Sequence, residues 1–401
     1  MKKLIFPIFI AFCVGITFYA TRKKAAAGQE KFEWQRSSFS ERGYDTKSLD
    51  SMLMLIRNGT YGYVNELLIT QGEKILVRES FGNDYRKISG NMSGKMGCGF
   101  GACEDSSAIS LYNYYHPRYH PYYQNTRLHT LQSITKSITA TVVGLAATDI
   151  DRFDVEKPLA PYFTDWDMSS EMAAHLEQAT IRDLLTMRLG LSWKEAGLTL
   201  EEESDVTNME LSEDWVRYVL GTEVSSRPDS IWNYSSGASL LLSEVIRQET
   251  GMQLADYAKE HLFKPLGIEA YFWKTTPNGL TDTEGGLYLK PEDLAKIGLL
   301  YLRDGHWMGR QLLTESWVKD SFTKHSTGVY GNGGNEGYGY QWWITQLTPP
   351  DLLGLGYGGQ ALLISPDSDV VVVINAWNVF DEEVDNIFAG LLPVLNEMKS
   401  Q

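Results

Sequence analysis

The chain has 401 residues, of which 43% are hydrophobic and 22% are charged, a composition typical of packed globular proteins that excludes a disordered, collagen-like or coiled-coil chain. Its formal net charge of −15 at pH 7 argues against nucleic acid as a partner, because negatively charged phosphates would be repelled. Three cysteines cannot form a disulfide framework, and no paired Cys-x-x-Cys motif indicates a structural zinc site.

The N-terminus has the pattern of a targeting or anchoring segment. Lys2 and Lys3 precede an apolar run over residues 4–20, and three basic residues follow it at 22–24. The run is long for a signal peptide and at the lower limit for a membrane span, while the three alanines at 25–27 offer a cleavage site. An uncleaved membrane anchor and a removed signal both stay open for residues 1–30. Either predicts an exported protein, held at the cell envelope through this segment or secreted.

The first predicted elements are one helix and one hairpin. Residues 47–57 place apolar side chains three and four positions apart, which predicts an amphipathic helix. Residues 63–70 and 74–79 have strand-like patterns, and the tripeptide Gln71-Gly72-Glu73 between them predicts a tight turn. Sheet strands are therefore expected to begin early in the chain.

A long surface loop is predicted over residues 82–127, which are rich in Gly, Ser, Asn and Tyr and lack periodicity. Cys98 and Cys103 bracket a short Gly-rich stretch of this loop, and a disulfide between them and two free thiols are both open. His116 and His120 have the spacing of two metal ligands on a helix, but a proline follows each of them. Since a residue before proline avoids the helical conformation, we predict no metal site there.

The middle of the chain is predicted to be helical and its end to return to strands. Helical patterns cover residues 181–187, 215–220, 239–248, 254–262 and 292–302, strand patterns cover 338–345, 359–364 and 370–375, and 381–398 reads as a final helix. Strands at both ends with helices between them predict an α+β fold, with one antiparallel sheet flanked by helices and an inserted, mostly helical lobe. We expect one domain over residues 31–401, with the sheet lobe at about 45–130 and 330–401 and the helical lobe at about 131–329.

A candidate nucleophile and base stand at the start of a predicted helix. Ser133 and Lys136 are three residues apart, so their hydroxyl and amine can meet on one helix face. The lysine can take the serine's proton only if desolvation or a neighbouring cation lowers its pKa from about 10.4 towards neutrality. The positive end of the helix dipole favours a developing alkoxide. Taken alone, the spacing also fits an N-capping serine with a solvated lysine.

Two later motifs supply possible partners. Tyr234 can pass a proton between a lysine and a leaving group, and the hydroxyl of Ser236 can complete such a relay. Gly358 and Gly359 precede an apolar strand, so that a substrate carbonyl can lie against the strand edge. The backbone N–H groups of Gln360 and of the candidate nucleophile would then form an oxyanion hole.

These motifs, in this order, resemble those of the active-site-serine family that contains class C β-lactamases, D,D-peptidases (penicillin-binding proteins) and related esterases and amidases. The resemblance is carried by Ser-x-x-Lys at 133–136, Tyr-x-Ser at 234–236 and Tyr-Gly-Gly at 357–359. Supporting stretches at residues 181–187, 285–287, 293–298 and 338–343 also look like family members. Together they span about residues 45–400.

The resemblance implies a β-lactamase/transpeptidase-like fold with the site between its two lobes, and a covalent acyl-enzyme mechanism without a metal or cofactor. In that mechanism Ser133 attacks the substrate and Lys136 accepts its proton. Tyr234 protonates the leaving group and later activates water, although lysine and tyrosine act as one coupled pair.

Two departures from the family pattern bear on the substrate. Tyr357 stands where β-lactamases and D,D-peptidases have a cationic Lys or His that helps hold the substrate carboxylate, and a neutral phenol binds a carboxylate less strongly. Ser236 replaces the Asn of β-lactamases, as in esterase-like and aminohexanoate-oligomer-hydrolase-like relatives. With Gly358 and Gly359, these two residues are the predicted substrate contacts. We expect an ester or amide of a small or peptide-like substrate. A D,D-peptidase acting on cell-wall peptides and a non-catalytic binding protein are the alternatives.

Overall fold

The computed structural model describes residues 31–83, 126–195, 204–327, 335–378 and 384–399. Residues 33–401 form one compact unit and residues 1–32 another, and the described helices and strands lie in the larger unit. Within the described residues, none of the helices combines the length and the apolarity needed to cross a membrane.

Several expectations fall on parts of the chain that lie outside the described residues. They are the signal or anchor over residues 1–30, nearly all of the loop over 82–127 with Cys98 and Cys103, and the pair His116 and His120. They stay predictions from the sequence.

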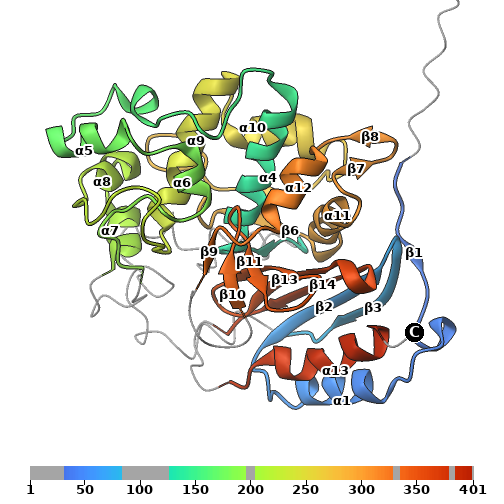
Figure 1. The fold of residues 1–401 in the computed structure, drawn as a ribbon. Coiled ribbons are helices and arrows are strands. Elements are labelled where there is room, and N and C mark those ends of the chain that lie inside the picture. Colours follow the sequence, from blue (N-terminus) through green and yellow to red (C-terminus); the bar gives the residue numbers. More distant parts are fainter. Residues whose placement is uncertain (1–30, 84–125, 196–203, 328–334, 379–383, 400–401) are drawn as a thin grey trace, which may run out of the picture. The chain divides into compact units, whose positions relative to one another are not determined.

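A large mixed sheet organises the compact unit (Figure 1). Among the described residues it has nine strands, in the order β1 (Gln35–Arg36), β3 (Lys74–Ser80), β2 (Val64–Gln71), β14 (Val370–Ala376), β13 (Gln360–Ser365), β12 (Leu352–Gly356), β11 (Trp343–Thr345), β10 (Asn335–Tyr338) and β9 (Ser326–Thr327). Neighbours pair antiparallel except β1 and β3, which are parallel. Because β14 pairs with β2, segments from the two ends of the chain meet in the sheet centre, as the α+β prediction requires.

Helices cover both faces of this sheet (Figure 1). One face packs against α1 (Lys47–Arg57) and α13 (Ile387–Lys399), and an apolar cluster fills the space between these layers. Near the other face lie α4 (Ile134–Asp149), α11 (Pro291–Leu302) and α12 (Glu315–Ser321). A Cβ on Gly298 of α11 would meet Val371 of β14 at 2.6 Å, so a glycine here allows close contact between helix and sheet. Both α4 and α11, which fall in the range expected for the helical lobe, therefore contact the large sheet.

Of the remaining elements, α9 (Ser236–Thr250), α10 (Leu254–Ala258) and the π-helical turn η4 (Lys259–Phe263) pack against α4. The helical part also contains η3 (Ala160–Phe163), α5 (Ser170–Leu176), α6 (Ile181–Leu185), α7 (Asp205–Leu211) and α8 (Trp215–Leu220). Two small sheets are formed by β4 (His129–Thr130), β6 (Leu287–Leu289) and β5 (Phe272–Trp273), and by β7 (His306–Trp307) and β8 (Arg310–Gln311). The first of these sheets leads directly into α4.

Most of the local predictions agree with the structure. The helix at 47–57 has its predicted bounds, and the hairpin is formed by β2 and β3. The single strand predicted over 338–345 is wrong, because the chain turns between β10 and β11: Gln341 has a φ of 59°, and Gly339 N–H donates to Trp342 O at 2.8 Å. The final helix begins at Ile387 rather than at 381. The helix predicted over 254–262 is α-helical only to Ala258 and continues as a π-helical turn.

Candidate active site

The nucleophile candidate stands at the N-terminus of a buried helix. Ser133 is the N-cap residue of α4, but its side chain makes no capping hydrogen bond. Every residue of α4 from Ile134 to Ala146 is buried, as expected for a helix that is apolar nearly all round. The polar side chains inside it are bonded to other elements: Ser137 donates to Gln341 O at 2.7 Å, and Thr139 donates to Thr283 O at 3.1 Å. These contacts fix the helix, and with it the position of the serine.

Lys136 lies one helical turn from the serine and is fully buried. Its Nζ donates to Ser133 Oγ at 3.1 Å and to the backbone oxygen of Glu284 at 2.7 Å, and it lies 3.3 Å from Glu284 Oε2. Nζ also lies 5.3 Å from the ring centroid of Tyr234, whose hydroxyl is hydrogen-bonded to the side chain of Ser133. The structure therefore brings Ser133, Lys136 and Tyr234 together.

The pKa of Lys136 is shifted in the opposite direction from the one that a base would need at neutral pH. Burial by itself lowers the pKa of its ammonium, but the acidic groups of Tyr234, Glu284 and Glu195, each of which would attract the ammonium in its ionised form, outweigh burial and raise the pKa above its ordinary value. The condition of a lowered pKa is therefore not met in this state of the protein. The physical reason is that the lysine's close charged neighbours are acidic groups rather than a second cation.

Tyr234 is held as a neutral phenol in an aromatic wall. Burial, with Glu195 and Glu284 nearby, raises the pKa of its hydroxyl, although Lys136 and the hydrogen bond to Ser133 act in the opposite direction. The ring stacks on Trp343, with centroids 5.6 Å apart and planes at 19°. It also meets Tyr338 edge-on at 6.2 Å. This packing fixes the direction of the phenol relative to the serine.

Ser236 is buried at the start of α9, with 1% of its surface exposed. Its Oγ lies within donating distance of Glu195 Oε1 at 2.5 Å and of Glu284 Oε2 at 3.1 Å. Its backbone N–H donates to Glu195 Oε2 at 3.0 Å. The structure thus places this predicted substrate contact between two carboxylates.

Glu195 and Glu284 were missed by the sequence argument. Glu284 stands immediately before the Gly285-Gly286-Leu287 stretch that supported the family resemblance, but that stretch marks the segment and does not single out the glutamate. Glu195 follows Trp193 by two residues, and the indole N–H of Trp193 donates to it at 2.5 Å. Isolated glutamates carry no pattern, so only the folded structure shows that they reach the lysine.

The third motif forms the turn between β12 and β13. Gly358 and Gly359 have φ values of 81° and 87°, which favour glycine. A Cβ on Gly356 would lie 2.3 Å from Leu131 O, so the β12 strand end passes directly against the residues that precede Ser133. The turn after this strand is therefore held near the nucleophile.

Tyr357 and Gln360 occupy opposite environments in this turn. Tyr357 is 39% exposed, whereas Gln360 is 2% exposed. The Gln360 side chain donates to Gly358 O at 3.2 Å and to Ala376 O at 2.6 Å. The buried side chain thus holds the turn in shape, and the backbone N–H is the part of Gln360 assigned to the oxyanion by the sequence argument.

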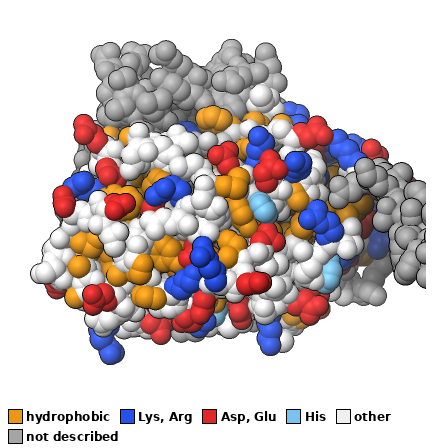
Figure 2. All heavy atoms as spheres, turned by 90° about the horizontal axis from the view of Figure 1, so that it is seen from above, with side chains coloured by type: hydrophobic (Ala, Val, Ile, Leu, Met, Phe, Trp, Pro, Cys, Tyr) orange, Lys and Arg blue, Asp and Glu red, His pale blue; other side chains and the backbone are white. Residues whose placement is uncertain are grey.

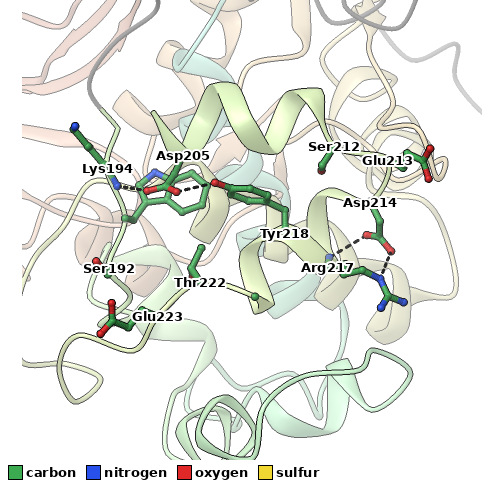
Figure 3. A pocket seen from close by; sticks show the side chains of 12 residues that line it. Ser192, Lys194, Asp205, Ser212, Glu213, Asp214, Arg217, Tyr218, Thr222 and Glu223 are labelled. Carbon is green, nitrogen blue, oxygen red and sulfur yellow. Dashed lines mark hydrogen bonds and ion pairs between the residues drawn. The ribbon is translucent and has the colours of Figure 1, made fainter. Parts of the chain in front are cut away.

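A cavity of about 880 Å³ is lined by Trp193 and lies between the segment at 192–194 and helices α7 and α8 (Figure 3). Asp205 points into the space between its partners, accepting from the Lys194 backbone N–H at 2.7 Å and from the Tyr218 hydroxyl at 2.8 Å (Figure 3). On another part of the wall, Asp214 lies 4.0 Å from Arg217 Nε and accepts from the Arg217 backbone N–H at 3.0 Å (Figure 3). Trp193 connects this wall to the Glu195 carboxylate, but none of the candidate catalytic residues lines the cavity. Over the described parts of the chain, no group of three or more His, Cys, Asp or Glu side chains is placed to hold a metal ion.

Comparisons with known proteins identify the family and the fold. The family model described as Beta-lactamase matches residues 110–390, which is more than half of the chain. A curated relative, 6-aminohexanoate-dimer hydrolase of Paenarthrobacter ureafaciens, is 24% identical over 268 residues, covering 62% of this chain and 66% of the relative. The chain thus spans just under two thirds of that relative's length.

Solved structures show the same fold at low sequence identity. A Bacillus anthracis structure provisionally named as a 6-aminohexanoate-dimer hydrolase has a TM-score of 0.63 at 18% identity, covering 86% of this chain and 79% of its own. EstCE1, described as a hydrolase with promiscuous acyltransferase activity, has a TM-score of 0.60 at 14% identity, covering 88% of this chain and 98% of its own. These likenesses establish a β-lactamase/transpeptidase-like fold.

Proposed function

We propose, from the premise that this chain belongs to the Beta-lactamase family and is a serine hydrolase, that it acts through a covalent acyl-enzyme on Ser133. The observation that carries the proposal is the hydrogen bond of 3.1 Å from Lys136 Nζ to Ser133 Oγ. Both atoms lie at the start of a fixed helix, and the hydroxyl of Tyr234 bonds to the same serine. A nucleophile in contact with both an amine and a phenol has the partners that acyl transfer needs.

The proposed roles follow from these contacts. Ser133 Oγ attacks the substrate carbonyl while its proton passes to Lys136, and the backbone N–H groups of Ser133 and Gln360 receive the oxyanion. Tyr234, a neutral phenol, donates a proton to the leaving group and then assists the water that hydrolyses the acyl-enzyme. The reaction thus needs Lys136 as a free amine at the moment of attack.

The substrate is proposed to be an ester or amide of a small or peptide-like molecule. Exposed Tyr357 stands where relatives carry a cation for the substrate carboxylate, and Gly358 and Gly359 leave room for a carbonyl beside the turn. The name of the curated relative, a hydrolase of the 6-aminohexanoate dimer, supports an amide among the substrates. Ser236 serves this site, in our proposal, through the carboxylates that it contacts.

The location of the protein is a separate proposal. The basic flanks and apolar run of residues 1–30 support export, with attachment to the cell envelope or secretion.

The surface charge bears on the kind of partner. On the face of the molecule seen in Figure 2, acidic and basic side chains are interspersed, which suits a protein that meets small molecules rather than a polyanion.

A substrate panel on the full chain tests the proposed function. We expect turnover of p-nitrophenyl acetate or butyrate, or of a p-nitroanilide amide, and no long-lived label from a fluorescent penicillin. Stable penicillin labelling without ester or amide turnover would instead identify a D,D-peptidase. A folded protein that turns over none of these substrates and takes no label would leave a binding protein and overturn the proposal.

A further inference from the structure

A cluster of buried ionisable side chains lies behind the nucleophile. It contains four acids and two lysines: Glu195, Glu210, Asp282, Glu284, Lys136 and Lys274. Of these, Glu210, Asp282, Glu284 and both lysines are at most 5% exposed. If all six groups were ionised, the cluster would carry two excess negative charges away from water, which is costly. The acids must therefore share protons.

Glu284 is the centre of this cluster. Its Oε2 lies 3.3 Å from Lys136 Nζ and 3.1 Å from Ser236 Oγ, and its side chain is hydrogen-bonded to that of Glu210. Asp282 Oδ1 accepts from the Glu284 backbone N–H at 3.2 Å, which fixes the loop that carries Glu284 just before β6. The carboxyl group that touches Lys136 is thus itself held from two sides.

Burial shifts the pKa values of the groups around Glu284. Burial, together with Glu284 and Asp282, raises the pKa of Glu210 well above its ordinary value, which favours its protonated form. Burial lowers the pKa of Lys274 to about 8, against the pull of Asp282, Glu210 and Glu284. Burial also raises the pKa of Glu195, although Lys136 and Ser236 oppose it. The groups facing Lys136 are Tyr234, Glu195 and Glu284, and only for the last of these is a direct contact with Nζ found in the described residues.

We propose that Glu284 is a positioning residue that holds Lys136 against Ser133 and accepts a proton from it, so that Lys136 meets the serine as a free amine. This inference rests on the proposed function and adds to it. A lysine that is an ammonium at rest can act as a base once it has passed a proton to Glu284. Lys136 Nζ and Glu284 Oε2 are 3.3 Å apart, so a proton passed between these two atoms stays within the buried cluster.

The step balances in protons and electrons. Lys136 ammonium and Glu284 carboxylate become amine and carboxylic acid. The Ser133 Oγ–H bond then breaks as Oγ bonds to the carbonyl carbon, its proton joins Lys136 Nζ, and the carbonyl π electrons move onto the oxygen. When the tetrahedral intermediate collapses, those electrons re-form the carbonyl, the bond to the leaving group breaks, and Tyr234 protonates the leaving group. Lys136 then protonates Tyr234, and Glu284 returns its proton to Lys136.

The contacts of Glu284 allow its charge to be separated from its geometry. Lys136 Nζ also donates to the backbone oxygen of Glu284, at 2.7 Å, and this bond is independent of the side chain. In Glu284→Gln the amide oxygen can still accept from Ser236, so the substitution removes mainly the proton acceptor. Glu284→Asp keeps the acceptor and shortens its reach by one methylene.

Glu249 on α9 provides a matched control for the substitution of Glu284. Glu249 Oε1 pairs with Lys157 Nζ at 2.7 Å and is largely buried, so it is a Lys–Glu pair like the one at the site. It lies thirteen residues after Ser236 on the same helix, roughly 20 Å away. Glu249→Gln removes an equivalent charge without touching Lys136.

The experiment is the pH profile of kcat for p-nitrophenyl butyrate between pH 6 and 9, on the full chain, with folding checked by circular dichroism. In the parent and in Glu249→Gln the Lys136–Glu284 pair keeps one shared proton over this range, so we expect a flat profile. In Glu284→Gln the lysine must lose its proton to solvent, so kcat should rise by about tenfold per pH unit and fall furthest below the parent at pH 6, with KM changed less than about twofold.

Glu284→Asp should restore the flat profile at a lower kcat, which a merely structural role would not do. A flat profile in a folded Glu284→Gln overturns the inference, and so does a rising profile in Glu284→Asp, which keeps the experiment decisive if Glu284→Gln does not fold. Failure of this inference leaves turnover by the parent intact, whereas failure of the proposed function abolishes it, so the two are distinguishable.

Discussion

The sheet face under α1 and α13 and the interior around Lys136 are both buried, but by different physical means. Between the sheet face and these helices, apolar side chains such as Leu67 and Ile374 of the sheet and Leu391 of α13 leave water together, and each buried apolar Å² contributes about 25 cal/mol. Around Lys136 the buried groups are an ammonium, carboxylates and hydroxyls, whose burial costs free energy even when they are paired. Burial in the first region stabilises the fold. The costly burial of charged groups in the second region serves the chemistry at Ser133.

This difference predicts that substitutions in the two regions have separable effects. Changes on the sheet face should alter the free energy of unfolding and leave kcat per folded molecule nearly unchanged. Changes at the reacting groups of the polar site, which are Ser133, Lys136 and Tyr234, should alter kcat more than stability. A substitution on the sheet face that lowers kcat, or one at a reacting group that changes only stability, would contradict this separation.

The largest effect is expected for Ser133→Ala, which removes the attacking oxygen and should lower kcat/KM for a p-nitrophenyl ester by roughly a thousandfold or more. Ser137→Ala is the matched control, one turn along α4. It removes the 2.7 Å bond to Gln341 O and should cost about 1–3 kcal/mol of stability, with activity within a few-fold of the parent. Steady-state kinetics and thermal unfolding of both variants check this. Ester turnover by Ser133→Ala within tenfold of the parent would contradict the assignment.

A smaller effect, confined to stability, is expected on the sheet face. Leu391 and Leu392 are neighbours on α13, but Leu391 is 0% exposed and Leu392 is 52% exposed. Leu391→Ala should therefore destabilise the protein by about 2–5 kcal/mol, and Leu392→Ala by less than about 0.5 kcal/mol. Urea denaturation measures both values. If Leu391→Ala also reduced kcat of the folded fraction more than a few-fold, the two regions would not be independent.

A third prediction concerns His129, which lies outside both regions compared above and is 3% exposed. Burial lowers the pKa of its imidazole from 6.5 to about 4, and the hydrogen bond to Thr130 O only partly opposes this. As the pH falls below 6.5 the unfolded chain binds this proton first. The free energy of unfolding should therefore decline between pH 6.5 and 4 and level off below that, by on the order of 3 kcal/mol for this group.

The test of this prediction is the difference between the parent and His129→Gln, because carboxylates titrate in both. The loss of stability from pH 7 to pH 4, measured by urea denaturation, should be smaller in the variant by that amount. Equal pH dependence in the two proteins would show that His129 is not buried as a neutral imidazole.

The sequence predicted the elements whose signal is local. The apolar spacing in residues 47–57 and the turn tripeptide at 71–73 are complete within a few positions, and α1 and the β2–β3 hairpin followed from them. The turn within 338–345 was missed because Gln341 is held by contacts with distant helices: Ser137 donates to its carbonyl and Ser239 to its side chain. Such contacts leave no local pattern.

The candidate site divides in the same way. Ser133, Lys136 and Tyr234 could be predicted because their motifs have fixed spacing and order. Glu284 could not, since it meets Lys136 across 148 positions of the chain, and Glu195 meets Ser236 across 41. The raised pKa of Lys136 depends on Tyr234 and on those two carboxylates, so the protonation state of the lysine could not be predicted from the motifs alone.

The central claim is that Ser133 carries the acyl group. Its most direct test is reaction of the full chain with a fluorophosphonate probe, followed by digestion and mass spectrometry of the labelled peptide. The account predicts one adduct, on the hydroxyl of Ser133, with loss of ester turnover in proportion to labelling. An adduct on another residue, or turnover that continues in fully labelled protein, would contradict it.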